Sequence, residues 1–190
     1  PQRIFIEKTY RNPQELIDIA GSFIMKNPKQ IRKSLKSPKN LKKPVKIIYP
    51  QKNPIEKREM IYSLIKDLSE KSDDVLILGR TNNNINQFIK HRNLVKKGNL
   101  KKDKFLRILD KTDKSMNNVY YRTLHSSKGL EADNVIIINM VDDYLGFPSK
   151  LKTHSVLNYV NTRNYDYKYS EERRLFYVGL TRSKNNVYLI

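Results

Sequence analysis

A polar loop between two apolar runs holds the most varied reactive side chains in the sequence. It spans residues 123–133 and carries hydroxyl, imidazole, ammonium and carboxylate groups. Residues 135–138, which follow it, form a continuous β-branched run, as expected of a parallel strand that is buried on both faces. Because ligands of open α/β sheets bind at loops that leave strand ends, we expect this loop to line a functional site.

Further polar residues flank two predicted helices. Tyr10 and Arg11 come just before a predicted helix start, where the positive end of the helix dipole could hold an anion. On local evidence alone, an ordinary surface role for these two side chains is favoured. Near the other end of the chain, residues 171–182 begin with two glutamates and end with Arg182. This block and the polar loop carry most of the functional information.

Three motifs resemble known catalytic patterns without matching them. Residues 127–129 are not a phosphate-binding P-loop, because the pattern Gly-x-x-x-x-Gly-Lys-Ser/Thr is absent from the sequence. Asp142 and Asp143 follow a hydrophobic strand as magnesium-binding carboxylates do, but without a P-loop there is no phosphate chain to share the metal, and we expect no metal ligands. His125 and Glu131 could be an acid/base pair, yet no nucleophile or third orienting group accompanies them.

Helical and strand-like patterns alternate along the chain, which favours an α/β fold with a parallel sheet. A strand is expected to lead into residue 123. Further strands are expected at residues 45–49, 73–82, 135–138 and 186–190, and helices at residues 13–25, 55–68, 83–89 and from 171 onward.

The first and last of these helices have candidate capping residues. Asn12 is expected to cap the first helix, with Pro13 at the first helical position and Glu15 reaching back toward the cap. Ser170 is expected to cap the last helix. Helical spacing predicts one buried face of the first helix, made of Leu16, Ile19, Ala20 and Phe23.

Three stretches show little periodicity. Residues 27–46 combine prolines with many lysines and predict a basic, mostly irregular connection. Residues 90–114 are strongly basic and poor in apolar residues, so they predict either a short helix packed by one face or a flexible loop. Residues 150–169 predict an irregular insertion.

Length and composition favour one domain with a polyanionic partner. The 190 residues fit a single domain, and 38 Lys and Arg against 19 Asp and Glu give a net charge of +19. So strong a positive field favours nucleic acid, although an AT-rich genome would also enrich lysine. The absence of cysteine excludes thiol chemistry and fits a reducing, cytoplasmic location. We expect no membrane partner, because no segment is long and apolar enough to span a bilayer.

Three blocks, in this order, resemble the second RecA-like motor domain of UvrD/Rep-like superfamily 1 DNA helicases. Residues 8–11 look like motif IV of that family, residues 123–131 like motif V, and residues 171–182 like motif VI. Residues 75–82 further resemble the strand and Arg-Thr-Asn cluster called motif IVa. The resemblance covers nearly the whole chain. It implies a RecA-like, P-loop-NTPase-type α/β domain with a mainly parallel sheet flanked by helices and without its own P-loop.

Within the family, the likeness is greatest to the helicase IV branch. That branch shares the Asn-Pro-x-Gln block at residues 27–30 and the Gly-Phe-Pro turn at residues 146–148. Long-form relatives insert an accessory domain before motif V, whereas here residues 90–118 are too few for one. We therefore expect residues 1–190 to be a single C-terminal RecA-like domain, cut from a longer protein.

The resemblance assigns nucleotide-binding roles to five residues. It implies that Arg11 and Arg182 reach the γ-phosphate of ATP in a cleft between two RecA-like domains. A guanidinium suits this role, because it is always charged and its planar fork matches phosphate oxygens. By the same resemblance, Tyr10 stacks on adenine, Glu131 accepts a hydrogen bond from the ribose, and Gly129 lets the backbone approach closely.

The resemblance also implies contacts with DNA and with a partner domain. The candidate DNA-binding residues are Thr123, His125, Ser126 and Lys128, with Arg80 and Asn82 as weaker candidates. The partners are single-stranded and duplex DNA and the N-terminal RecA-like domain of the same protein, which should hold the P-loop and the Mg²⁺ ligands for ATP. This chain alone is therefore expected not to hydrolyse ATP. The alternative is a non-catalytic nucleic-acid-binding or interaction module with a helicase-like fold.

Overall fold

The computed structural model describes residues 7–31, 34–50, 52–71, 73–89, 91, 93–98, 105–114, 116, 118–144, 146–150, 167 and 169–190. Its strands are β1 (Val45–Ile47), β2 (Val75–Gly79), β3 (Leu94–Lys97), β4 (Leu106–Asp110), β5 (Val119–Thr123), β6 (Ala132–Ile137) and β7 (Ser183–Leu189). Its helices are α1 (Gln14–Ile24), α2 (Pro54–Glu70), α3 (Asn84–Phe88), the short 3-10 helix η1 (Leu124–Ser127) and α5 (Ser170–Leu180).

Within the described residues, seven strands form one sheet in the order β1-β7-β6-β2-β5-β4-β3. The first five strands in this order, from β1 to β5, pair in parallel. Beyond them, β4 pairs with β5 and β3 pairs with β4, both in antiparallel fashion. The predicted α/β fold with a mainly parallel sheet is confirmed. Because η1 and the residues after it join β5 to β6, the polar loop runs from the carboxyl end of one strand to the amino end of another.

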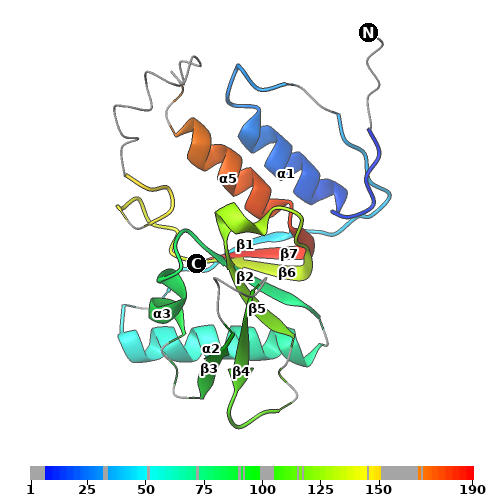
Figure 1. The fold of residues 1–190 in the computed structure, drawn as a ribbon. Helices are drawn as coiled ribbons and strands as arrows, with labels where there is room; N and C mark the ends of the chain where they lie inside the picture. The colour runs from blue at the N-terminus through cyan, green and yellow to red at the C-terminus, as the bar shows by residue number, and fades with distance from the viewer. Residues whose placement is uncertain are drawn as a thin grey trace.

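Helices cover both faces of this sheet (Figure 1). Helices α1 and α5 lie on one face, where Leu16 and Leu180 join a buried cluster, and α2 lies on the other, where Ile65 is fully buried. The central strand β2 contributes to both: Ile77 packs in the cluster beneath α2, and Leu78 packs in the cluster beneath α1 and α5. A continuous apolar run in the sequence therefore marks a strand between two helical layers.

The antiparallel hairpin of β3 and β4 contradicts the helix or loop expected over residues 90–114. In β4, Leu106, Ile108 and Asp110 are buried, and Arg107 between them is exposed. This alternation of buried and exposed side chains is typical of a strand, and β4 pairs with β5, where Ile108 lies opposite Val119. The alternation is only five residues long and lies among lysines, so the basic composition concealed it.

The predicted caps are also wrong. Pro13 itself is the N-cap of α1 and has no side-chain cap bond, and Glu15 accepts a hydrogen bond from the Leu41 amide at 2.8 Å. Asn12 bonds elsewhere, to residues near the end of the chain. Ser170 is the first residue of α5 rather than its cap.

Two further expectations changed in detail. Ile19 is 41% exposed and does not belong to the buried face of α1, whose buried residues are Leu16, Ala20 and Ile24. The last strand begins at Ser183, three residues earlier than expected. Most of the insertion expected at residues 150–169 lies outside the described residues.

Candidate functional site

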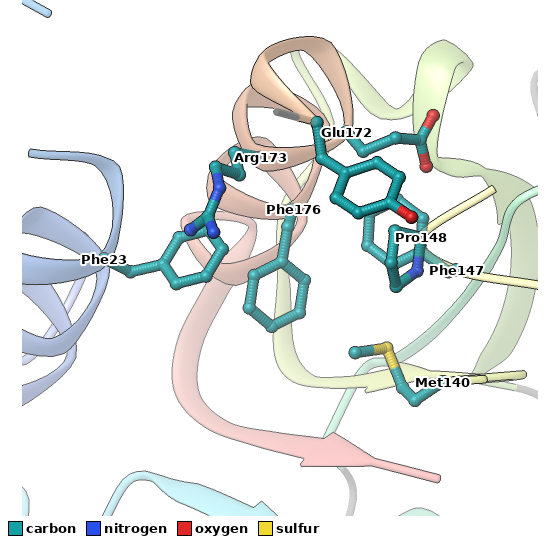
Figure 2. A pocket seen from close by; sticks show the side chains of 8 residues that line it. Phe23, Met140, Phe147, Pro148, Glu172, Arg173 and Phe176 are labelled. Carbon is teal, nitrogen blue, oxygen red and sulfur yellow. The ribbon is translucent and has the colours of Figure 1, made fainter. Parts of the chain in front are cut away.

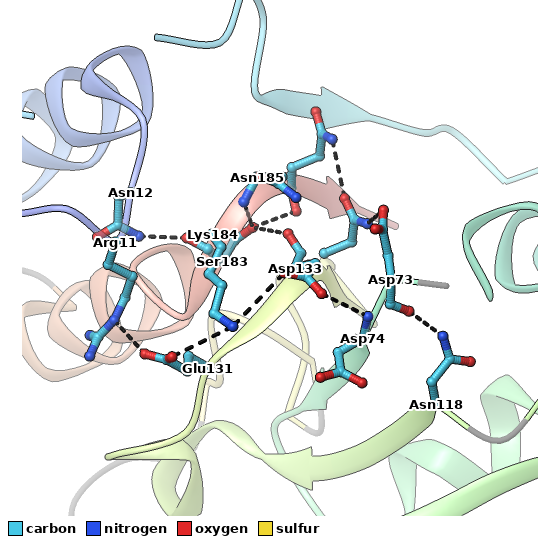
Figure 3. Close-up of polar contacts among 12 residues, drawn as sticks. Arg11, Asn12, Asp73, Asp74, Asn118, Glu131, Asp133, Ser183, Lys184 and Asn185 are labelled. Carbon is cyan, nitrogen blue, oxygen red and sulfur yellow. Dashed lines mark hydrogen bonds and ion pairs between the residues drawn. The ribbon is translucent and has the colours of Figure 1, made fainter. Parts of the chain in front are cut away.

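Four charged side chains gather at the amino ends of β6 and β7 and form what we call the arginine cluster: Arg11, Glu131, Arg182 and Lys184 (Figure 3 shows three of them). The Arg11 Nε donates to the Glu131 carboxylate at 2.8 Å, with the two side chains 41% and 43% exposed. The Lys184 ammonium lies 3.6 Å from the other oxygen of Glu131 and 3.9 Å from Asp133. Glu131 is thus shared between two cations.

Arg182 is the deeper of the two arginines. Its Nε donates to the carbonyl oxygen of Val178 at 2.9 Å, and its Nη1 donates to that of Leu130 at 3.3 Å. Burial lowers the pKa of Arg182 and the charge of Arg11 lowers it further, whereas Glu131 opposes the shift. A guanidinium still keeps its proton at neutral pH. The two positive groups therefore lie near enough to repel each other, and an anion bound between them would relieve this repulsion.

Tyr10 and Gly129 border this cluster along the chain. The Tyr10 ring is 69% exposed, and the Lys8 ammonium lies 5.1 Å from its centroid. Gly129 has φ +81 and no heavy atom within 4 Å of where a Cβ would lie. Backbone conformation rather than crowding therefore requires glycine here, and the space beside it is open to a ligand.

A second charged group lies where β2 and β5 end. Arg80, which follows β2, has an ion pair of 2.9 Å with Glu172 of α5 and lies 3.3 Å from the His125 ring. The other carboxylate oxygen of Glu172 accepts from the Ser149 amide at 3.1 Å. Partial burial lowers the pKa of His125, and the positive charge of Arg80 lowers it further. The negative charge of Glu172 raises the pKa, but by less than these two effects lower it. His125 therefore favours its neutral form.

The remaining predicted site residues lie near this second group along the chain. The Thr123 hydroxyl donates to that of Ser126 at 3.2 Å. Ser126, Lys128 and Asn82 are exposed. The polar loop therefore joins two separate groups, with His125 beside Arg80 at one end and Glu131 beside Arg11 at the other.

A small apolar pocket of about 200 Å³ adjoins the second group (Figure 2). Phe23 of α1 and Phe176 of α5 form part of its wall, with ring centroids 5.0 Å apart, and Phe147 lies 5.8 Å from Phe176. Glu172 lines the same pocket, so the carboxylate that holds Arg80 also borders this apolar space.

Across the described ranges, no three His, Asp or Glu side chains gather where they could bind a metal ion. None of the helices that the structure describes is both long and apolar enough to cross a membrane.

Sequence reasoning missed Lys184, Glu172 and Asn12. Lys184 stands two positions after Arg182 and could have been found as part of the same block. Glu172 was assigned to the helix dipole, and only the contact between α5 and the end of β2 gives it an arginine partner. Asn12 was assigned to a helix cap, and its long-range contacts leave no signal in the local sequence.

Comparison with known proteins gives consistent matches. The family model of the UvrD-like helicase C-terminal domain matches residues 89–190. DNA helicase IV from Escherichia coli (strain K12) is 25% identical over 189 residues, which cover 100% of this chain and 24% of that protein. ATP-dependent DNA helicase Rep from Buchnera aphidicola subsp. Schizaphis graminum is 40% identical over 72 residues, 38% of this chain and 9% of that protein.

One solved structure is similar over most of the chain. It is the C-terminal domain of a possible DNA helicase from Lactobacillus plantarum, with a TM-score of 0.52 and 15% identity, and the match covers 95% of this chain and 86% of that one. At this identity the likeness shows the fold alone. The chain spans about a quarter of the length of the helicase IV relative (24%).

Proposed function

The chain belongs to the family of UvrD-like helicase C-terminal domains, and from this premise we propose that it is the C-terminal motor domain of an ATP-dependent DNA helicase. In the full-length protein it would move along single-stranded DNA and open duplexes, using ATP bound between this domain and an N-terminal RecA-like domain. Residues 1–190 would form one such domain, with the hairpin of β3 and β4 in the region, residues 90–118, where relatives insert an accessory domain.

The arginine cluster is the observation that carries this proposal. Arg11 lies at the surface and near enough to the half-buried Arg182 for its charge to lower the pKa of Arg182, an arrangement that supports binding of one phosphate by both. In the proposed mechanism both would reach the γ-phosphate and stabilise the charge that develops during its transfer. An arginine in this role contributes a factor of about 10³–10⁵ in rate.

Binding of nucleotide would exchange the partners within this cluster. Glu131 is now occupied by Arg11 and Lys184, so a phosphate that draws Arg11 away would free one carboxylate oxygen for a ribose hydroxyl. The exposed ring of Tyr10 would stack on adenine, and the open space beside Gly129 would admit the nucleotide.

The other end of the polar loop would contact DNA. The proposed contacts are Arg80, Asn82, Thr123, His125, Ser126 and Lys128. Because eight residues, 124–131, connect the two ends, a shift of Glu131 on nucleotide binding would be transmitted along a short segment that packs against α5. This is how hydrolysis would be coupled to movement.

ATP would bring Mg²⁺ with it, held by carboxylates of the N-terminal domain. This sequence supplies the completing arginines but no P-loop. The isolated chain should therefore bind DNA weakly and should not hydrolyse ATP.

The test is DNA-stimulated ATPase activity of the full-length protein, comparing wild type, Arg182→Ala and Arg107→Ala. Arg107 is an exposed arginine on β4 and serves as the matched control. We expect Arg182→Ala to lower kcat by about a hundredfold or more while ATP binding persists, and Arg107→Ala to stay within about twofold of wild type. Absence of stimulated hydrolysis in the wild type would favour a non-catalytic binding module instead.

A further inference from the structure

Asn12 is buried beside the exposed arginine of the cluster. It is 7% exposed, although Arg11 before it reaches the surface. Its side-chain amide donates to two carbonyl oxygens, that of Thr181 at 3.2 Å and that of Ser183 at 2.6 Å. Figure 3 shows the second of these bonds. Since neither bond belongs to a helix cap, the amide is used entirely for long-range contact.

These two carbonyls belong to the residues on either side of Arg182. One amide therefore ties the segment that carries Arg11 directly to the segment that carries Arg182. The Arg182 backbone is also held independently, because its carbonyl accepts from the Ala132 amide at 3.1 Å. Loss of the Asn12 contact should therefore shift the Arg11 segment, while the Arg182 backbone stays bonded to Ala132 of β6.

The chemistry of this contact is specific to a carboxamide. Two carbonyl acceptors need two N–H donors on one short side chain, which asparagine supplies. Aspartate has the same shape but would place oxygens against oxygens, and serine supplies a single donor.

We propose that Asn12 is a positioning residue that sets the distance between Arg11 and Arg182, so that both guanidinium groups reach one phosphate. This inference rests on the proposed ATPase function. Two like charges drift apart unless the backbone holds them, and Asn12 is the buried side chain whose bonds join their two segments at this point.

The test uses the full-length protein with Asn12→Ala, Asn12→Asp and Asn12→Ser. We expect kcat to fall about tenfold or more in the alanine and aspartate variants, with serine intermediate, while KM for ATP changes by less than about threefold. The matched control is Asn134→Ala on β6, which removes another buried side-chain amide. This amide donates to the Asp73 carboxylate at 2.9 Å and contacts neither arginine segment through that bond. This control should lower the melting temperature and leave kcat near wild type.

Two outcomes would overturn the inference: an Asn12→Ala enzyme with wild-type kcat, or an Asn134→Ala enzyme that loses as much kcat as Asn12→Ala. A thermal-melting cycle of Asn12→Ala, Arg182→Ala and the double variant tests the link without ATPase activity. Losses in melting temperature that are less than additive support it, because both side chains would then stabilise the same contact between the two segments, and additive losses contradict it. If the wild type hydrolyses no ATP but the cycle shows coupling, the proposed function fails and the structural link stands.

Discussion

At the scale of single residues, charge pairing decides which cations meet a ligand directly. Arg80 is held by Glu172, whose side chain is only 12% exposed, so the proposed contact with DNA would require Arg80 to leave this partner. Lys128 in the polar loop is exposed. Arg11 has a partner too, but the Arg11–Glu131 pair is open to solvent, where such pairs contribute about 1 kcal/mol or less. We therefore expect the proposed nucleotide phosphate to replace Glu131 more easily than DNA would replace Glu172.

His125 should titrate below its ordinary pKa of 6.5 in the folded chain, because of partial burial and then the charge of Arg80. Since the unfolded chain takes up this proton at higher pH than the folded chain, the contribution of His125 to stability should fall as pH drops below 6.5. A histidine NMR titration measures the pKa directly. Arg80→Ala should raise the pKa, and an unchanged value would show that Arg80 does not act on this ring.

At the scale of elements, close packing of α5 against the polar loop holds the two charged groups in place. Gly179 lies where a Cβ would be 2.6 Å from Leu124 of η1 and 3.0 Å from Ile137 of β6. Both neighbours are fully buried and cannot easily move. The absence of a side chain at Gly179 therefore lets α5 approach the sheet.

Gly179→Ala should lower the free energy of unfolding by about 1–3 kcal/mol, because overpacking outweighs the helix propensity gained. Gly21→Ala in α1 is the matched control, since nothing lies within 4 Å of its Cβ position. That change should be neutral or should stabilise by about 0.5–1 kcal/mol. Chemical denaturation of both variants measures the difference, and equal effects would refute the packing argument.

Helix α2 is joined to the antiparallel hairpin by a buried carboxylate. The Tyr62 hydroxyl donates to Asp110 at 2.6 Å, and Thr112 donates to the other oxygen at 2.7 Å through its hydroxyl and 2.8 Å through its amide. Burial of Asp110 opposes its ionisation, but these bonds outweigh that effect and lower its pKa to about 2. The ionised form is therefore the one that the fold stabilises.

Tyr62→Phe should lower the free energy of unfolding by about 1.5–3 kcal/mol at neutral pH, the range for a hydrogen bond to a charged group. The folded pKa lies below the unfolded value of 3.8, so the stability contributed by Asp110 is present above pH 4 and is lost as pH falls toward 2. Unfolding curves between pH 5 and 2 should show a weaker pH dependence in Tyr62→Phe than in wild type. Parallel curves would contradict this account.

At the scale of the whole molecule, the net charge of +19 acts on any polyanion before specific contacts form. Its distribution is uneven along the chain: between Asp18 and Glu56 the sequence contains no acidic residue. Neutralised phosphates release counterions, so affinity for single-stranded DNA should fall as salt rises.

If Arg80 and Lys128 alone neutralise phosphates, affinity should fall about sevenfold between 50 and 200 mM salt, since each contact adds about 0.7 to the logarithmic slope. Lys128→Ala should lower that slope by about 0.7, whereas Lys66→Ala on α2 should leave it unchanged. Fluorescence anisotropy with a labelled oligonucleotide measures both slopes. A slope much steeper than that of two contacts would show that the basic surface elsewhere also binds DNA.

Local sequence patterns were enough to predict the buried parallel strands, the main helices and the three motif blocks. Continuous apolar runs such as residues 75–79 and 135–138 require burial on both faces, and helical spacing marks α1 and α2. These features depend on neighbours along the chain, so local patterns reveal them. The arginines and the polar loop were found in the same way, because each motif is contiguous in the sequence.

The pairing of these residues, by contrast, depends on contacts between segments far apart in the chain. The β3–β4 hairpin depends on an edge offered by β5, and the contacts of Asn12 and Glu172 join residues far apart in the chain. Likewise, no local pattern shows that the two ends of the polar loop meet different charged groups. Propensity acts over a few residues, whereas ion pairs and buried amides form between whichever segments the sheet order brings together.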